Sequence, residues 1–351
     1  MTMTSGSKIR IVADTSVPFF RGVFEPWADV VYIEGPEIGP DDVRNADALV
    51  VTTTTRCDAS LLEGSSIKLI ASATSGVNHI DTEWCGTHGI EVRNAPGCNA
   101  GGVMEYIFSG IYATASRGSI DLRGKVIGII GAGNIGKRVE AMGMNLGFKV
   151  LKNDPPREAA EGHYEFCSLD YLLAHSDIVI MLVPLGESTR GMVGRKFFSS
   201  MKKGSFFINA ARGELVDDEA LKKAIPSLGP VIIDTWNHEP DVDRELLSMV
   251  TVATPHIAGF SYQGKQNATA TAVRGIARFF GIPSLNEFFP ETDVPELEAV
   301  KLDLHDKSQG EIASVFQYNY PIFTDDFMFR MHPENFESLR AGYKYRREVY
   351  F

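Results

Sequence analysis

Three side chains suited to proton transfer and anion binding follow three successive apolar strands that the sequence predicts. The strands and the side chains after them are Phe206–Asn209 with Arg212, Val231–Asp234 with Glu239, and Val250–Ala253 with His256. Carboxyl ends of parallel strands meet at one edge of a sheet, and ligands of open α/β sheets bind there. We therefore expect the three side chains to lie close together.

These three residue types suit the oxidation of a hydroxy acid. An arginine binds a carboxylate through paired N–H donors, and a histidine accepts the hydroxyl proton because it titrates near neutral pH. A carboxylate beside the imidazole orients it and favours its charged form. Taken singly, each would be an ordinary surface or capping residue. Their shared position leads us to predict Arg212, Glu239 and His256 as catalytic, rather than the neighbouring His238.

A glycine-rich segment indicates the cofactor. Gly131, Gly133 and Gly136 form the pattern G-x-G-x-x-G between an apolar strand and a helical stretch, which is typical of dinucleotide binding. Asp154 ends the next predicted strand, 18 positions after Gly136. A carboxylate there binds ribose hydroxyls and repels a 2′-phosphate. The sequence therefore predicts NAD rather than NADP.

Composition excludes several classes of protein. The chain has 351 residues and a net charge of -11, which disfavours a nucleic-acid partner because such partners need a basic face. The four cysteines, Cys57, Cys85, Cys98 and Cys167, lack metal-binding spacing and predict free thiols. A polar N-terminus and the lack of a long apolar run predict neither a signal peptide nor a membrane partner. We expect a cytoplasmic protein without a metal site.

With these motifs the chain resembles the D-isomer-specific 2-hydroxyacid dehydrogenases over roughly residues 8–285. The segments that carry the resemblance are Gly131–Gly136, Asn209–Gly213, Glu239–Pro240 and Thr254–His256. The resemblance implies an α/β fold of two doubly wound parallel-sheet domains. A Rossmann NAD domain, residues 99–257, would be inserted in a flavodoxin-like substrate domain, residues 1–98 and 258–284. It also implies Arg212 for substrate binding, His256 as the acid/base and Glu239 as its partner.

Further segments resemble a branch of this family that acts on a phosphorylated hydroxy acid. They are Ala95–Ala100, Asp154–Arg157, His256–Phe260 and Phe336–Glu348. This branch implies a homodimer formed through a small α+β domain, here residues 285–351. Together with the glycine pattern it implies cofactor contacts at Gly131, Gly133, Asn134, Ile135, Gly136, Asp154, Val183, Ala210, Ala211, Arg212, Asp234 and Gly259. The implied substrate contacts are Thr53, Thr74 and Phe260.

Two positions depart from the pattern of that branch. Phe260 stands where a tyrosine is expected, and Thr52 where an arginine is expected to bind phosphate; Arg56 is a nearby substitute. A basic cluster near the C-terminus consists of Lys344, Arg346 and Arg347. It either forms a solvated surface or reaches the site of a partner subunit, where it would add positive charge near the phosphate. Two alternative functions stay open, a phosphoglycerate or glycerate dehydrogenase with the same machinery, and a non-catalytic NAD-sensing scaffold.

Overall fold

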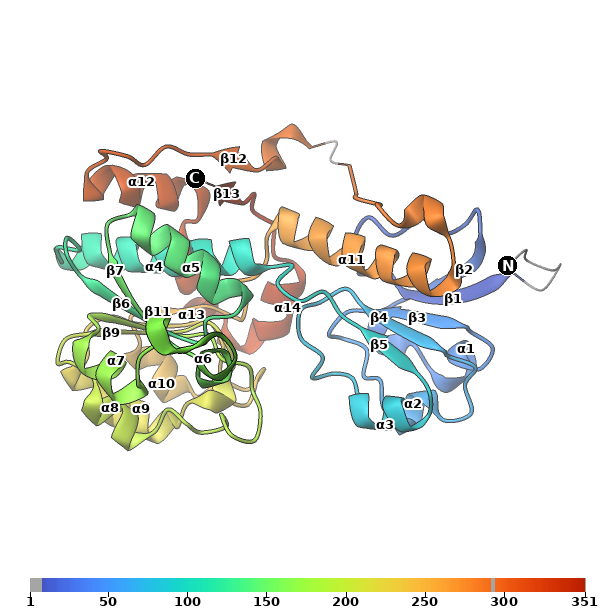
Figure 1. The fold of residues 1–351 in the computed structure, drawn as a ribbon, viewed down its shortest axis with the longest axis horizontal. Coiled ribbons are helices and arrows are strands. Elements are labelled where there is room, and N and C mark those ends of the chain that lie inside the picture. Colours follow the sequence, from blue (N-terminus) through green and yellow to red (C-terminus); the bar gives the residue numbers. More distant parts are fainter. Residues whose placement is uncertain (1–7, 292–293, 351) are drawn as a thin grey trace. The chain divides into compact units, whose positions relative to one another are not determined.

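The computed structural model describes residues 8–291 and 294–350 (Figure 1). The chain divides into two compact units. Unit 1 consists of Met1–Asn99 and Tyr262–Glu298, and unit 2 of Ala100–Ser261 and Ala299–Phe351. Unit 2 thus contains one long segment that interrupts the chain of unit 1.

Unit 1 is built on a parallel sheet. Among its described residues the strands are β1 (Ile9–Asp14), β2 (Ala28–Ile33), β3 (Ala48–Val51), β4 (Leu69–Ser72) and β5 (Glu91–Arg93). Their order in the sheet is β2-β1-β3-β4-β5, and all neighbours are parallel. This is the flavodoxin-like order that the sequence predicts.

Alternate residues of these strands feed two cores, because successive side chains point to opposite faces of a sheet. Ile11, Val50 and Ala71 lie in one core with residues of α11 (Tyr262–Phe280). Val12, Leu49 and Ile70 lie in the other core, which is completed by three short helices. These helices are α1 (Pro40–Val43), α2 (Ala59–Leu62) and α3 (Thr82–Thr87).

Unit 2 holds a second parallel sheet. Its described strands are β6 (Val126–Ile130), β7 (Lys149–Asn153), β8 (Ile178–Met181), β9 (Phe206–Asn209), β10 (Val231–Ile233) and β11 (Val252–Ala253). The sheet order is β11-β10-β9-β8-β6-β7. The chain passes from β6 outward to β7 and returns to β8 on the other side. That reversal is the switch point at which doubly wound sheets bind dinucleotides.

Helices cover both faces of this sheet. The helices packed on one face are α4 (Ala100–Gly118), α5 (Asn134–Asn145) and α12 (Gln309–Asn319). Those on the other are α7 (Leu169–His175), α8 (Arg195–Ser200), α9 (Asp218–Ala224) and α10 (Arg244–Met249). α6 (Pro155–Glu161) follows β7. The 3-10 helices among the described residues of both units are Gly35–Glu37, His163–Glu165, Gly213–Leu215, Ile225–Ser227, Pro283–Leu285, Pro295–Leu297 and Pro333–Asn335. The predicted α/β class with two doubly wound sheets is confirmed.

The C-terminal segment differs from the prediction of a separate domain at residues 285–351. Residues 299–351 belong to unit 2, and 285–298 to unit 1. The segment contains β12 (Val300–Lys301), α12, α13 (Ile322–Met331), α14 (Phe336–Ala341) and β13 (Val349–Tyr350). Phe316, Phe329 and Phe336 are almost fully buried in the cores of unit 2, so these helices complete that unit rather than form a core of their own.

Candidate active site

The glycine pattern forms a tight turn between β6 and α5. Gly131 has φ +95°, and a Cβ there would lie 2.7 Å from the main chain of Leu182 and Val183, at the end of β8. A Cβ on Gly136 would lie 2.4 Å from the Gly131 carbonyl oxygen. A Cβ on Gly133 would meet no atom within 4 Å, so this part of the loop faces open space. The turn therefore has the close packing and the open approach that a pyrophosphate requires.

The start of α5 is suited to bind an anion. Gly133 caps the helix without a side-chain hydrogen bond, and no acidic residue lies in the first turn. The first N–H groups of such a helix have no partner within the helix, and its dipole favours negative charge. Asn134 is exposed and Ile135 is half-buried at this end. The residues present fit a dinucleotide phosphate.

Asp154 lies directly beside this turn. One carboxylate oxygen accepts from the Ala132 N–H at 2.9 Å, and the other accepts from the Arg157 N–H at 3.1 Å as the cap of α6. The Arg157 guanidinium donates to the Ala132 carbonyl and pairs with Glu161 at 2.5 Å. The charge of Arg157, which follows Asp154 on α6, is thus compensated by Glu161, and this suits a ribose without a 2′-phosphate.

The structure brings His256 and Glu239 into direct contact. Glu239 Oε2 lies 2.8 Å from His256 Nδ1, and Glu239 Oε1 accepts from the Trp236 N–H at 2.8 Å. Burial alone would raise the pKa of Glu239, but the hydrogen bond and charge of His256 outweigh it, so the pKa lies below its ordinary 4.5. Glu239 is therefore anionic at neutral pH. Nε2 is the ring nitrogen that does not contact Glu239.

The backbone of His256 is held by Asp234. His256 has φ +56°, which few residues other than glycine adopt. Its N–H donates to the Asp234 carbonyl at 2.8 Å, and the Asp234 carboxylate accepts from the N–H groups of Ile257 at 2.8 Å and Ala258 at 3.0 Å. Burial raises the pKa of Asp234. The structure thus places the Asp234 carboxylate, a predicted NAD contact, within the protein, where it supports the loop that carries His256.

Arg212 reaches the same edge through a close contact between two turns. A Cβ on the following residue, Gly213, would lie 1.9 Å from the carbonyl carbon of Trp236. Only glycine therefore allows the turn after β9 to pack against the turn that leads to Glu239. The Asn209 side-chain amide donates to the Arg212 carbonyl at 2.9 Å, and Arg212 Nη1 donates to the Ala211 carbonyl at 2.6 Å.

The other predicted cofactor contacts lie at the same edge. Ala210 and Ala211 are 8 % exposed at the end of β9. Val183 is half-buried and adjoins Gly131, and Gly259 is half-buried in the loop after His256. The carboxyl edge of the unit 2 sheet therefore carries all of the cofactor contacts that the sequence predicts.

The predicted substrate contacts Thr53 and Thr74 follow β3 and β4 in unit 1. Thr53 is exposed. The Thr74 hydroxyl donates to the Gly76 carbonyl at 2.9 Å and lies 2.7 Å from Ser72 Oγ, which lies 3.2 Å from His79 Nε2. Burial lowers the pKa of His79 to about 4, so the ring is neutral and supports this chain of hydrogen bonds. No motif in the sequence marks Ser72.

Thr52, where an arginine is expected, lies over a buried carboxylate. Its hydroxyl donates to Asp14 at 2.6 Å. Burial would raise the pKa of Asp14, but hydrogen bonds from Thr52 and Ser16 hold it below its ordinary value. Arg56, the suggested substitute, pairs with Asp58 at 2.6 Å. The hydroxyl group of Thr52 thus stands at the position where an arginine is expected. Asp58 compensates the charge of Arg56.

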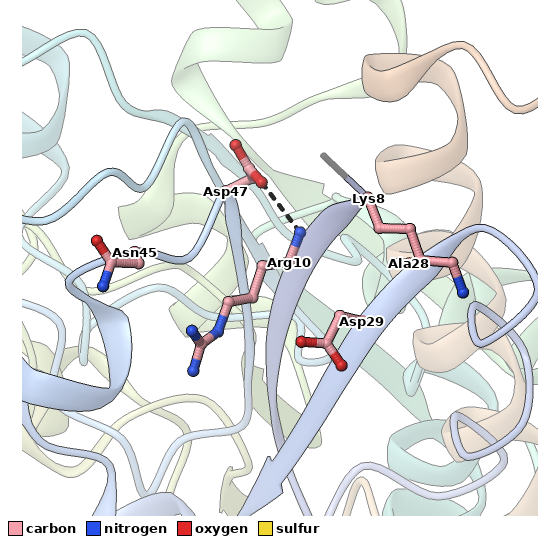
Figure 2. A pocket seen from close by; sticks show the side chains of 6 residues that line it. All are labelled: Lys8, Arg10, Ala28, Asp29, Asn45 and Asp47. Atoms are coloured by element: carbon pink, nitrogen blue, oxygen red, sulfur yellow. Dashed lines mark hydrogen bonds between the residues drawn. The ribbon is translucent and has the colours of Figure 1, made fainter. Parts of the chain in front are cut away.

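A separate hollow lies at the opposite edge of the unit 1 sheet. Figure 2 shows its lining, which comes from the amino ends of β1, β2 and β3: Lys8, Arg10, Ala28, Asp29, Asn45 and Asp47. One of its charges is paired outside the lining, since Asp47 bonds to Lys68 at 2.7 Å and also accepts from the main-chain N–H of Arg10 at 3.0 Å. Because open α/β sheets bind ligands at carboxyl ends, we do not assign the active site here.

Phe260, the third predicted substrate contact, lies among residues of the C-terminal segment. Its ring centroid is 5.9 Å from that of Tyr343 and 6.4 Å from that of Tyr345. The Arg340 guanidinium lies 5.9 Å from the Phe260 ring, and its Nε donates to the His256 carbonyl at 3.3 Å. Local sequence patterns could not show this contact, because Arg340 and His256 are 84 positions apart. Arg346 of the basic cluster pairs with Asp325 in the same unit.

Comparison with known proteins identifies the family. Residues 105–258 match the model of the D-isomer specific 2-hydroxyacid dehydrogenase, NAD binding domain. The chain is 40% identical to an erythronate-4-phosphate dehydrogenase of Bacteroides fragilis, over 97% of each chain. The chain belongs to the erythronate-4-phosphate dehydrogenase family of D-isomer-specific 2-hydroxyacid dehydrogenases. The resemblance predicted from its motifs is confirmed, and unit 2 is its NAD-binding unit.

Two further relatives agree. An erythronate-4-phosphate dehydrogenase of Porphyromonas gingivalis is 36% identical, over 97% of this chain and 94% of the relative. The crystal structure of NAD⁺-bound 3-phosphoglycerate dehydrogenase of Entamoeba histolytica matches with a TM-score of 0.69 and 25% identity, over 80% of this chain and 98% of that one. In the part of the chain that the structure describes, no helix is long and apolar enough to cross a membrane. The same residues contain no cluster of metal-binding side chains.

Proposed function

We propose that this protein oxidises 4-phospho-D-erythronate to 2-oxo-3-hydroxy-4-phosphobutanoate with NAD, and that the reaction serves pyridoxal 5′-phosphate biosynthesis. The observation that carries the proposal is the His256–Glu239 pair, 2.8 Å apart at the edge that carries the glycine turn. Similarity to erythronate-4-phosphate dehydrogenases over nearly the whole chain supports the choice of substrate.

Each residue of the site has a role in this reaction. Arg212 binds the C1 carboxylate and polarises the oxygen on C2. His256 Nε2 accepts the proton of the C2 hydroxyl, and Glu239 stabilises the resulting imidazolium. When bound, NAD would supply the acceptor for the hydride of C2. The proton and the hydride together account for the oxidation of the alcohol to a ketone.

We assign different residues to the binding of NAD and to the binding of the substrate. Asp154 binds the adenosine ribose, and the turn of Gly131 to Gly136 with the start of α5 binds the pyrophosphate. We assign Thr53 and Thr74 to the substrate, through hydroxyl groups and the main chain that Thr74 holds. Phe260 provides an apolar contact in place of a hydroxyl group.

A pair of histidine variants tests the catalytic assignment. We expect His256→Ala to lower kcat by about 10²-fold or more, because general base catalysis contributes about 10²–10⁴-fold. NADH binding, followed by fluorescence, should be retained. His238→Ala is the matched control, since His238 is exposed in the adjoining loop, and it should keep normal turnover. Normal turnover of His256→Ala would refute the mechanism.

A comparison of NADH formation with 4-phospho-D-erythronate, phosphoglycerate and glycerate separates the proposed function from its alternatives. A phosphoglycerate or glycerate dehydrogenase would form NADH with those acids and not with 4-phospho-D-erythronate. A non-catalytic scaffold would bind NAD and form no NADH with any of them. Either result would overturn the proposed function.

We also propose that the protein is a cytoplasmic homodimer. Phe327 and Met331 are 59% and 56% exposed on α13, and their spacing of four places them on one helix face. A second copy that covers this face would remove apolar surface from water. Four free cysteines suit a reducing compartment. Light scattering should give twice the chain mass for the wild type and a smaller mass for Phe327→Glu; a monomeric wild type would refute the dimer.

A further inference from the structure

The catalytic loop is supported from two sides. Asp234 holds the N–H groups of His256, Ile257 and Ala258. The carbonyl oxygen of His256 accepts from Arg340 Nε at 3.3 Å. The left-handed backbone of His256 is an uncommon conformation that persists only when its surroundings fix it. The Arg340 contact is one of the bonds that fix it.

Arg340 itself is firmly placed. Its side chain is 19% exposed, and its guanidinium lies 5.9 Å from the ring centroids of both Phe260 and Phe336. Phe336 is fully buried at the start of α14 and packs on Phe329, with ring centroids 5.6 Å apart. Phe336 therefore anchors α14 in the core, and α14 holds Arg340 beside the loop that carries His256.

Phe329 also lies beside the turn that carries Trp236 and Glu239. The ring of Phe329 lies 5.9 Å from that of Trp236. The Trp236 indole N–H donates to the Thr254 carbonyl at 2.9 Å, and its main-chain N–H donates to Glu239. The C-terminal segment thus packs against the turn of Glu239 and bonds to the peptide of His256.

We propose that Arg340 is a positioning residue for catalysis, which fixes the His256 main chain so that the imidazole stays aligned with Glu239 and the substrate. The proposal rests on the proposed function for its kinetic consequences, and it gives the C-terminal segment a role in catalysis besides assembly. The positive charge of Arg340 also favours the anionic form of Glu239, because it contributes to the low pKa of that carboxyl group.

Three variants separate positioning from general loosening of the segment. Arg340→Met removes both charge and donors, and Arg340→Lys keeps the charge but loses the planar donor group. Arg117→Met is the matched control, because Arg117 on α4 also contacts the C-terminal segment, with its guanidinium 5.2 Å from the Phe323 ring. Each is compared with the wild type for oligomeric state and for stability in denaturant.

Kinetics with 4-phospho-D-erythronate carrying deuterium at C2 give the first readout. We expect Arg340→Met to lower kcat by about tenfold or more, with KM for NAD within about threefold, since only the chemical step loses alignment. The deuterium isotope effect on kcat should rise, whereas partial unfolding lowers kcat without changing it. Arg340→Lys should fall between Arg340→Met and the wild type, and added guanidinium should restore part of the activity of Arg340→Ala.

Hydrogen exchange gives a second readout that needs no substrate. Amides of the peptide around residues 254–260 should exchange faster in Arg340→Met, while Arg117→Met leaves them unchanged. Normal kcat and normal exchange in Arg340→Met would overturn the proposal, as would equal effects in both variants. If wild-type protein fails to oxidise 4-phospho-D-erythronate, the proposed function fails, and the exchange of this loop still decides the role of Arg340.

Discussion

Replacing Glu239 by glutamine should harm catalysis more than replacing it by alanine. In the structure one carboxylate oxygen accepts from the Trp236 N–H at 2.8 Å, and the other accepts from His256 Nδ1 at 2.8 Å. The Trp236 N–H can only donate, so it selects the oxygen of a glutamine amide. The NH₂ group then faces Nδ1 and forces the ring proton onto Nε2. That tautomer cannot accept the substrate proton.

The magnitudes follow from what each variant loses. Alanine removes a charge-assisted hydrogen bond worth about 1.5–3 kcal/mol, which corresponds to about 10–150-fold in kcat. A ring held in the wrong tautomer costs up to about 10⁴-fold. We therefore expect the kcat of Glu239→Gln to lie at least about tenfold below that of Glu239→Ala.

NADH absorbance at saturating substrate measures both variants, and denaturant unfolding checks that both are folded. The order of the two rates is the decisive result. A glutamine variant more active than the alanine variant would show that Glu239 does not set the tautomer of His256.

Other perturbations test the supports of the site. Gly213→Ala places a Cβ 1.9 Å from the Trp236 carbonyl carbon, so denaturant unfolding should show a loss of about 1–3 kcal/mol or more, whereas Gly310→Ala, with no atom within 4 Å of its Cβ, should not. Asp154→Asn should reduce the preference in kcat/KM for NAD over NADP by about tenfold or more, as a negative charge is removed; an unchanged ratio would contradict the assignment. The pKa of Glu239 is lowered on folding, so its contribution to stability is present above its ordinary pKa of 4.5 and lost as pH falls through the lower value. Unfolding free energies at about pH 5 and about pH 3 should therefore differ more in the wild type than in Glu239→Gln.

The elements that the sequence predicted best are buried on both faces. β9 has the bounds that the sequence predicts, Phe206–Asn209, and all four of its residues are buried. β2, in contrast, is an edge strand, where only Ala28 is fully buried and Asp29 is exposed. Its apolar run, residues 30–33, is only half-buried, so apolar composition alone does not separate this edge strand from a central one.

The site shows the same division between local and distant signals. Glu239 and His256 follow adjacent strands, so sheet topology predicts their contact. Arg340 meets His256 across 84 positions through the packing of aromatic rings, which no spacing in the sequence encodes. The resemblance to the branch of the family implied a separate domain at residues 285–351. Its buried phenylalanines instead complete the core of unit 2.

The central claim is the oxidation of a phosphorylated four-carbon acid, and the ratio of kcat/KM for 4-phospho-D-erythronate to that for D-erythronate tests it most directly. The assay uses NAD and follows initial rates of NADH formation by absorbance. We predict a ratio of about 100 or more, since charge-assisted hydrogen bonds to a phosphate are each worth about 1.5–3 kcal/mol. A ratio near one, or turnover of the unphosphorylated acid alone, would contradict the account.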